Sequence, residues 1–258
     1  MRILLIRHGD PDYEHDTLTE KGWREAALLA KRAPYLQMGD CYLSPLGRAQ
    51  DTASLPMKET GKTGVTKNWL QEFPAYADLT AAPELRQAYP ELREEEKKDN
   101  RIGCIWDMLP SYWTEHEEYY DRTAWRQSLV AKAGNLTELY DEVTGQLDAL
   151  LAEYGYVREH QHYRVEREHI ETVTFFCHYG ISCVLLSHLW NVSPFVLWHS
   201  LVLAPSSVTE IYTEEREQGV AYWRATRVGD LSHLYAGGEE PSASARFCEV
   251  YSNFDERH

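Results

Sequence analysis

The chain has 258 residues, and its 41 aspartates and glutamates outnumber its 26 lysines and arginines, so the formal net charge at pH 7 is −15. This balance argues against a protein that works mainly by binding nucleic acid or an anionic membrane, because both need a basic surface field. Hydrophobic residues make up 43% of the chain, a share that argues against disorder and predicts a packed core.

The apolar runs and the cysteines indicate the compartment. The longest early apolar run, Ile3–Ile6, is too short for a signal-peptide core or a membrane span, and no later run is long enough either. The cysteines are odd in number and have no CxxC pairs, which argues against disulfides and a structural zinc site. We therefore expect a cytoplasmic protein with reduced thiols and with no membrane or nucleic-acid partner. The cysteines are Cys41, Cys104, Cys177, Cys183 and Cys248.

The chain opens with a strand and a helix. Residues 2–8 form a short apolar run closed by Arg7 and His8, which is typical of a buried strand in a parallel sheet. The pattern TLTE at 17–20 is a capping box and predicts a helix that runs to about Pro34.

A second strand and helix follow. The strand is predicted at 41–43, and the Ser-Pro pair at 44–45 predicts the N-cap and first residue of a helix that continues to about Ala53. Strands and helices in alternation predict parallel strands with right-handed crossovers.

The segment 73–126 differs in character from its neighbours. Tyrosines and tryptophans are interleaved there with the charged run REEEKKD at 93–99. The segment is too long for a simple connection and too aromatic for a disordered linker, so we predict an insertion that folds over the sheet as a cap.

The remaining pattern predicts further helices and strands and then a tail. These elements are a helix over 136–151, a buried strand over 173–177, a helix over 181–190, an antiparallel hairpin at the sheet edge formed by 208–213 and 220–226, and a loop-like tail over 236–258 in which Phe247, Val250, Tyr251 and Phe254 are candidates for docking.

The predicted fold class is α/β. We expect a three-layer sandwich with a mostly parallel central sheet flanked by helices, plus a helical and aromatic cap insertion. The expected organisation is one domain over 1–258 that contains the insertion 73–126 and ends in the tail 236–258.

Polar residues follow three of the predicted strands at their carboxyl ends. Arg7, His8 and Gly9 close the first strand. Arg48 lies in the first turn of the helix after the second, and His178 follows the strand 173–177. Ligands of open α/β sheets bind outside the carboxyl ends of the strands. Two imidazoles, two guanidiniums and helix N-termini at one edge suit a dianionic phosphoryl group.

The sequence resembles the histidine phosphatase superfamily, which includes the cofactor-dependent phosphoglycerate mutases. The resemblance rests on LIRHG at 5–9, LSPLGRAQDTA at 43–53, LQE at 70–72 and FCHYG at 176–180. These motifs extend to about residue 190 and leave the insertion unmatched.

The resemblance implies roles for individual residues. His8 would be the nucleophile that becomes phosphorylated, and Arg7, Arg48 and His178 would clamp the phosphoryl oxygens. The glutamate of the LQE segment, Glu72, matches the proton donor of the large branch. The other branch takes its acid from an aspartate directly after the second histidine, and this chain has Tyr179 there, so the large branch fits better. The remaining expected substrate-binding residues are Gly9 and Tyr179.

The segment after Gly9 departs from the family pattern. Mutases have small polar residues and an asparagine there, whereas this chain has DPDYE at 10–14. Carboxylates in that place repel phosphate unless they are protonated or turned away. Nothing in the sequence indicates a phosphoenzyme protected from water, so hydrolysis is favoured over mutase chemistry. Tyr179 stands where a glycine is common and is expected to narrow the pocket.

Other interpretations stay open at this level. Asp10, Asp12 and Glu14 rival Glu72 as the acid. A cysteine phosphatase using Cys177 would need an arginine six residues on, where the chain has Cys183. The further alternatives are a phosphoglycerate mutase and a non-catalytic phosphate-binding protein on the same fold.

The preferred hypothesis is a phosphatase that needs neither metal nor cofactor. The pair His160 and His162 has no surrounding cluster of carboxylates and histidines at metal spacing, and a solvated strand or loop is favoured for it. In a chain of net charge −15 the phosphoryl site would be a small positive island, so small phosphorylated substrates are favoured over polyanions. A homo-oligomer is compatible with the sequence, which does not define the oligomeric state.

Overall fold

The computed structural model describes residues 1–244 and 250–252. The chain divides into two compact units. Unit 1 consists of Met1–Glu72, Tyr154–Ser182 and Val202–His258, and unit 2 consists of Phe73–Glu153 and Cys183–Leu201. The predicted insertion 73–126 falls wholly within unit 2 and begins where that unit begins. Its role as a cap stays a prediction.

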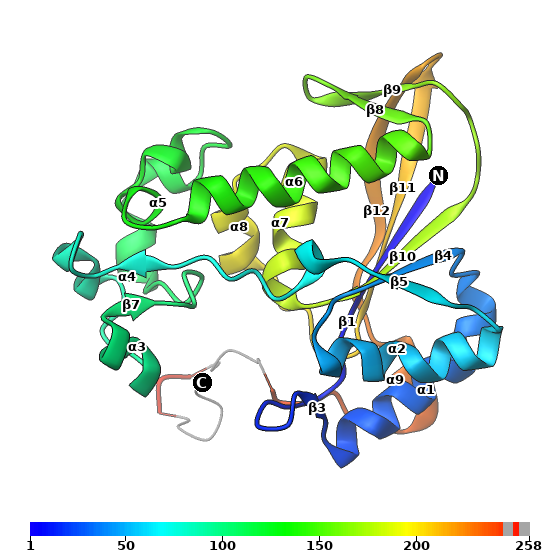
Figure 1. Cartoon of the computed structure of the whole chain (residues 1–258), viewed down its shortest axis with the longest axis horizontal. Coiled ribbons are helices and arrows are strands. Elements are labelled where there is room, and N and C mark those ends of the chain that lie inside the picture. The colour runs from blue at the N-terminus through cyan, green and yellow to red at the C-terminus, as the bar shows by residue number, and fades with distance from the viewer. Residues whose placement is uncertain (245–249, 253–258) are drawn as a thin grey trace. The chain divides into compact units, whose positions relative to one another are not determined.

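Unit 1 is built on an eight-stranded sheet with the order β5-β4-β10-β1-β11-β12-β9-β8 (Figure 1). The four strands from β5 to β1 are parallel, and each neighbouring pair from β1 to β8 is antiparallel. This arrangement confirms the predicted α/β class with parallel strands at the centre. The strands are β1 (Arg2–Arg7), β4 (Asp40–Leu43), β5 (Gly64–Thr66), β8 (Tyr156–Glu159), β9 (His162–Val165), β10 (Thr172–Cys177), β11 (Val208–Glu217) and β12 (Val220–Asp230).

Strand β10 lies between the first two strands of the chain. It pairs in parallel with β1, where Arg7 is opposite Cys177, and with β4, where Leu43 is opposite Phe176. All six residues of β10 are buried, as expected for a strand covered on both faces. The carboxyl ends of β1, β10 and β4 therefore lie side by side at one edge of the sheet.

Helices α1 (Glu20–Leu36) and α2 (Gly47–Thr60) pack on one face of this sheet. Their apolar residues share a buried cluster with side chains of β1, β4, β10 and β11, and burial of this kind supplies most of the stability of such a layer. The cluster contains Leu4, Ile6, Leu29, Ala33, Leu36, Met38, Cys41, Leu43, Ala53, Phe176 and Val208.

Both helices begin later than the sequence predicts. The N-cap of α1 is Thr19, whose side chain accepts from the Gly22 N–H, and 17–18 instead form strand β3 (Thr17–Leu18), paired with β2 (Pro11–Asp12). The N-cap of α2 is Leu46 and not Ser44. The hydroxyl of Ser44 contacts the ring of His178.

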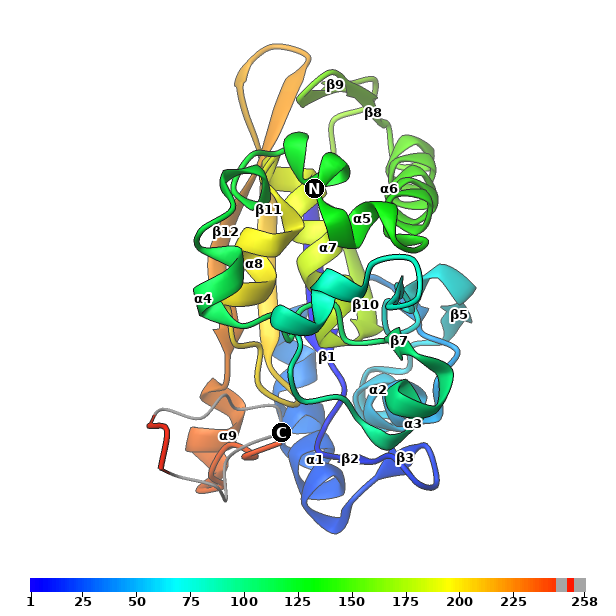
Figure 2. The ribbon, with the colours of Figure 1, turned by 90° about the vertical axis from the view of Figure 1, so that its left-hand side faces the viewer.

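The long hairpin β11–β12 is not at the sheet edge, and the prediction that placed it there is wrong. Strand β12 pairs with β9, and the β8–β9 hairpin forms the edge beyond it (Figure 2). The turn itself agrees with the sequence, because Gly219 has φ +80°, a conformation that glycine adopts without steric cost. His160 and His162 lie at the tip of the β8–β9 hairpin and in β9.

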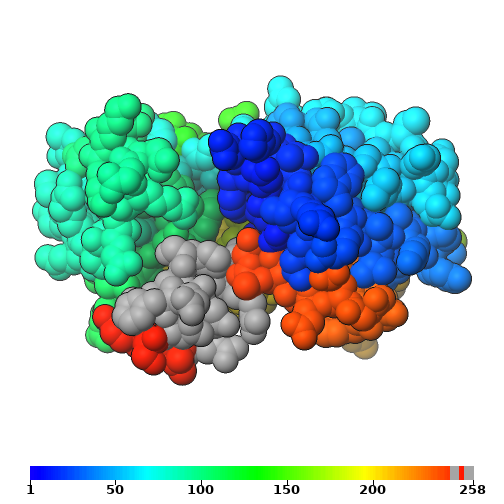
Figure 3. All heavy atoms as spheres, turned by 90° about the horizontal axis from the view of Figure 1, so that it is seen from below, coloured from blue at the N-terminus to red at the C-terminus, as the bar shows by residue number. Residues whose placement is uncertain are grey.

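The segment after β12 lies against α1. Helix α9 (Ser232–Gly237) packs on α1, and Figure 3 shows the orange late part of the chain beside the blue early part. Glu239 forms ion pairs with Lys21 at 2.9 Å and Arg24 at 2.8 Å. The tail therefore has at least one fixed portion. Of the docking candidates, Val250 and Tyr251 are exposed, and Phe247 and Phe254 lie outside the described residues.

Unit 2 is largely helical and aromatic. Its buried side chains include Tyr119, Trp125, Phe195 and Trp198, and the ring centroids of Tyr119 and Phe195 are 4.6 Å apart. The aromatic residues of the insertion thus form part of a packed core. The elements from residue 73 to 153 are β6 (Ala77–Asp78), β7 (Arg101–Ile102), α3 (Glu94–Asp99), α4 (Pro110–Trp113), α5 (Leu129–Lys132) and α6 (Leu136–Glu153), with 3-10 turns at Pro83–Gln87, Glu117–Tyr119 and Ala124–Gln127.

Helix α7 (Tyr179–Trp190) follows β10 directly and is succeeded by α8 (Pro194–Ser200). The predicted helices 136–151 and 181–190 are thereby confirmed. In the described part of the chain, no helix combines the length and the apolar character that crossing a membrane requires.

Candidate active site

His8 stands at the carboxyl end of β1 with its ring fixed by its own backbone. The side chain is buried, and Nδ1 lies 2.7 Å from the carbonyl oxygen of Gly9. A carbonyl only accepts, so Nδ1 carries the proton and Nε2 has a free lone pair. Nε2 is buried and has no hydrogen-bond partner among the described residues. Burial, and then the charge of Arg7, holds the pKa of His8 well below its usual value, so the ring is neutral at pH 7.

His178 stands at the carboxyl end of β10 beside His8. The ring centroids are 5.0 Å apart. Nε2 of His178 lies 2.7 Å from Oγ of Ser44, which follows β4. The remaining nitrogen, Nδ1, is buried and has no hydrogen-bond partner in the described part of the chain. Burial, and then the neighbouring His8, lowers the pKa of His178 well below its ordinary value.

Two guanidiniums share this edge of the sheet. Arg7, in β1, is buried, donates to the Leu203 carbonyl and lies 5.7 Å from the Tyr179 ring centroid. Arg48, in the first turn of α2, is buried and lies 5.3 Å from the Tyr13 ring centroid. Both charges lower the pKa of each histidine, which shows that the four side chains lie within one electrostatic environment.

Gly9 connects the His8 loop to α2. Its N–H donates to Oγ1 of Thr52 at 2.8 Å, and that hydroxyl donates to the Arg48 carbonyl at 2.7 Å. A Cβ at position 9 would lie 3.0 Å from the Gly22 carbonyl oxygen and 3.3 Å from the Glu25 carboxylate. A side chain there would require its neighbours on α1 to move by a few tenths of an ångström, so glycine suits the close packing.

Glu72 enters the site from the segment after the 3-10 turn Asn68–Leu70. Its Oε1 accepts a hydrogen bond from the Gly180 N–H at 2.8 Å. Ligand atoms of His8, Glu72 and His178 all lie within 4.8 Å of one another, a spacing that spans one phosphoryl group. The structure therefore brings together His8, Arg7, Arg48, Glu72 and His178, with Gly9 and Tyr179 beside them.

The same donor atoms form a potential metal site. Two imidazoles and a carboxylate are common zinc ligands. Arg7 and Arg48, however, impose a positive field on both imidazoles, and that field repels a dication and attracts an anion. The donor set therefore fits an oxyanion better than a metal ion. Among the described residues, His160 and His162 belong to no such cluster.

The acidic residues after Gly9 have partners of their own. Asp10 accepts from the hydroxyls of Thr19, at 2.6 Å, and Ser242. Asp12 lies 2.8 Å from the ring of exposed His15. Both carboxylates are therefore held by partners within the described part of the chain.

Sequence reasoning missed three residues that shape the site. Asp16 pairs with Arg48, Ser44 contacts His178, and Thr52 bridges Gly9 to α2. Ser44 and Thr52 lie inside the motif 43–53, so the motif could have identified them as candidate site residues. The sequence did not indicate Asp16, because no local pattern distinguishes it from the other carboxylates of its loop.

A buried carboxyl lies beneath this loop. Oε2 of Glu25, in α1, accepts from the Asp10 N–H at 2.8 Å, and Oε1 has no hydrogen-bond partner among the described residues. Burial raises the pKa of Glu25 to about 7. The site end of unit 1 thus contains a carboxyl group that is protonated in part of the molecules at neutral pH.

Cys177 is unsuited to act as a nucleophile. It is buried, and burial raises the pKa of its thiol to about 12. Only the thiolate attacks phosphorus effectively. The cysteine-phosphatase alternative therefore loses its nucleophile as well as its arginine.

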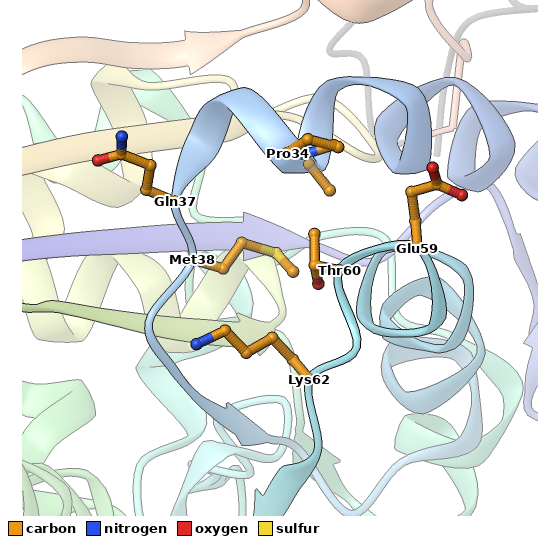
Figure 4. A pocket seen from close by; sticks show the side chains of 7 residues that line it. Pro34, Gln37, Met38, Glu59, Thr60 and Lys62 are labelled. Atoms are coloured by element: carbon orange, nitrogen blue, oxygen red, sulfur yellow. The ribbon is translucent and has the colours of Figure 1, made fainter.

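A separate hollow of about 380 Å³ lies between the ends of α1 and α2 (Figure 4). Gln37 and Met38, which line it, directly precede β4, so it lies at the amino end of that strand and not at the site. Its other lining residues are Ala33, Pro34, Glu59, Thr60 and Lys62.

The fold and the site together define an α/β protein with two buried histidines and two buried arginines at the carboxyl ends of its central strands. The family model of the histidine phosphatase superfamily (branch 1) matches residues 3–103 of this chain. No curated protein matches the sequence.

Solved structures share this fold at low identity. A mycobacterial glucosyl-3-phosphoglycerate phosphatase with inorganic phosphate is 18% identical, with a TM-score of 0.57, and the match covers 90% of this chain and 98% of that one. The same enzyme with VO3 is 19% identical, with a TM-score of 0.54 and coverage of 88% and 98%. A mutant phosphoserine phosphatase from Entamoeba histolytica with phosphoserine is 16% identical, with a TM-score of 0.56 and coverage of 90% and 98%.

Proposed function

We propose that the protein hydrolyses phosphomonoesters of small metabolites through a phosphohistidine on His8, without a metal ion. One observation carries the proposal. Nε2 of His8 is buried without a hydrogen-bond partner among the described residues, while Nδ1 is held on the Gly9 carbonyl. A neutral imidazole with its lone pair in the field of Arg7 and Arg48 is prepared to attack an anionic phosphoryl group.

The first step transfers the phosphoryl group to the enzyme. Nε2 of His8 forms a bond to phosphorus while the bond from phosphorus to the ester oxygen breaks. Arg7, Arg48 and His178 stabilise the charge on the three non-bridging oxygens. Glu72 gives its proton to the departing oxygen, which leaves as an alcohol.

The second step returns the enzyme to its starting state. Water attacks phosphorus, the bond to Nε2 of His8 breaks, and inorganic phosphate leaves. Glu72, now a carboxylate, takes the proton of the attacking water. The support for this role is its position, because a carboxyl oxygen of Glu72 lies within 4.8 Å of nitrogens of His8 and His178.

Small monoesters suit this site better than polyanions. The chain carries a net charge of −15, so a substrate with several phosphates meets a repulsive field outside the pocket. Solved structures of the same fold contain phosphoserine or belong to an enzyme named for glucosyl-3-phosphoglycerate, and both are small monoesters. We also propose a cytoplasmic location, which the odd number of cysteines and the lack of CxxC pairs support.

A panel of phosphorylated metabolites tests the activity. We expect release of inorganic phosphate from at least one small monoester. Conversion of one phosphoglycerate isomer into another without phosphate release would indicate a mutase. Tight binding of phosphate without turnover of any panel member would indicate a binding protein.

Chelation and vanadate test the mechanism. We expect full activity after treatment with EDTA and inhibition by vanadate, which adopts the trigonal-bipyramidal geometry of the transferring group. A preparation that loses its activity on chelation and regains it only with a divalent metal would assign His8, Glu72 and His178 to a metal site instead.

A further inference from the structure

Asp16 holds two groups at the start of α2. Its Oδ1 accepts from Nη1 of Arg48 at 2.7 Å, and its Oδ2 accepts from the Gly47 N–H at 2.7 Å. Leu46, the N-cap of this helix, has no side-chain oxygen to offer. A carboxylate from the loop between β2 and β3 therefore caps the helix, where the helix dipole favours a negative charge.

The backbone fixes the position of this carboxylate. Asp16 has φ +48°, a left-handed conformation that aspartate tolerates better than most residues. A Cβ at position 47 would lie 2.1 Å from the Asp16 carbonyl oxygen. Only glycine permits this approach, so the loop is docked closely on the first turn of α2.

The contact leaves a defined part of Arg48 available to a ligand. The side chain of Arg48 is 10% exposed, and its Nε is buried without a hydrogen-bond partner in the described part of the chain. The guanidinium is a rigid planar fork of N–H donors, so fixing Nη1 sets the direction of the Nε edge.

We propose that Asp16 is a positioning residue that orients Arg48 toward the phosphoryl group. Asp16 does not touch the substrate in this assignment and acts only through the guanidinium. The inference rests on the proposed function, in which Arg48 binds the transferring oxygens. It also explains why one carboxylate is placed next to an anion-binding arginine.

A double-mutant cycle tests the assignment. We expect Asp16→Ala to weaken vanadate binding, measured by calorimetry, by about 10-fold, the size of one lost oriented charge-assisted contact. In the Arg48→Ala background the same change should have almost no effect. Asp16→Asn keeps one acceptor and should retain part of the affinity if Asp16→Ala proves unstable. Glu14→Ala removes an exposed carboxylate from the same loop and should leave binding unchanged.

Several outcomes would overturn the assignment. An equal loss from Asp16→Ala with and without Arg48 would mark Asp16 as merely structural. Tighter vanadate binding by Asp16→Ala would mean that the carboxylate only offsets the charge of Arg48. Because vanadate binding needs no turnover, a chain that shows the coupling but hydrolyses no monoester would refute the proposed function and keep the assignment. A chain that hydrolyses monoesters, but in which the effects of Asp16→Ala and Arg48→Ala on vanadate binding are additive, would support the proposed function and refute the assignment.

Discussion

The two ends of strand β1 differ in how their polar groups are satisfied. At the amino end, the ammonium group of Met1 donates to the His169 carbonyl at 2.8 Å and to Thr213 Oγ1 at 2.7 Å. The guanidinium of neighbouring Arg2 donates to Thr172, Glu210 and the carbonyls of Leu36 and Gln37.

The carboxyl end shows the opposite pattern. Nε2 of His8, Nδ1 of His178, Nε of Arg48 and Oε1 of Glu25 are buried without a hydrogen-bond partner among the described residues. A buried polar atom without a partner costs free energy. The amino end therefore stabilises the fold, whereas the proposed site at the carboxyl end keeps donors and acceptors in place for a ligand.

Among the substitutions at the carboxyl end of β1, removal of the proposed nucleophile should lower activity most. We expect His8→Ala to lower turnover by about 10⁴-fold or more, because no other neutral imidazole nitrogen is held in the same place. An acid-labile, base-stable phosphoryl group should be trapped on His8 in the wild-type chain. His15→Ala, an exposed histidine of the following loop, is the matched control. Finding the label on Cys177 would refute the assignment.

Glu72→Gln removes the proposed proton and keeps the size of the side chain. We expect it to slow hydrolysis of alkyl phosphates by about 10²–10⁴-fold, the usual range for general acid catalysis. Phosphohistidine formation from p-nitrophenyl phosphate should fall much less, because a phenolate leaves without protonation. Equal losses on both substrates in single-turnover measurements would make Glu72 a binding or structural residue.

Glu25→Gln should relieve a cost that the site end imposes on stability. Its folded pKa of about 7 exceeds the ordinary value of 4.5, so the folded chain binds the proton more tightly than the unfolded one. The free energy of unfolding therefore falls as the pH rises from 4.5 to 7, by about 3 kcal/mol. The variant should lose this slope in denaturant titrations and be more stable at pH 8. Exposed Glu20→Gln on the same helix is the control, and an unchanged slope in Glu25→Gln would contradict the prediction.

Arg48→Ala should weaken the phosphoryl clamp. Loss of a charge-assisted contact to a desolvated dianion costs about 1.5–3 kcal/mol, measured as the change in vanadate affinity. Lys58→Ala on the same helix removes an exposed charge and should change almost nothing. Equal effects of the two substitutions would show that Arg48 does not reach the anion.

Arg2→Ala tests the amino end and should affect stability alone. We expect it to lower the free energy of unfolding by about 2 kcal/mol, because Glu210 loses a partner at a side chain that is 8% exposed. The value of kcat/KM should stay unchanged. Arg164→Ala, which breaks an exposed ion pair with Glu166, should change stability by less than about 0.5 kcal/mol. A loss of activity in folded Arg2→Ala would refute the division between the two ends.

Local sequence patterns predicted the strands of the candidate site and most of its residues. Apolar runs closed by polar residues predicted β1 and β10, and parallel pairing then requires their carboxyl ends to meet, so Arg7, His8 and His178 could be grouped before any contact was known. These strands could be predicted because a short apolar run closed by polar residues is a local pattern typical of a buried strand.

The partners of each polar group depend on the tertiary structure. It inserted β10 between β1 and β4, brought Glu72 to the Gly180 N–H, and directed Asp16 at Arg48 while Asp10 and Asp12 found other partners. It also placed the β11–β12 hairpin inside the sheet, next to β9. These outcomes depend on pairings between segments far apart in the chain. Carboxylates with the same local pattern differ only in what the fold brings beside them.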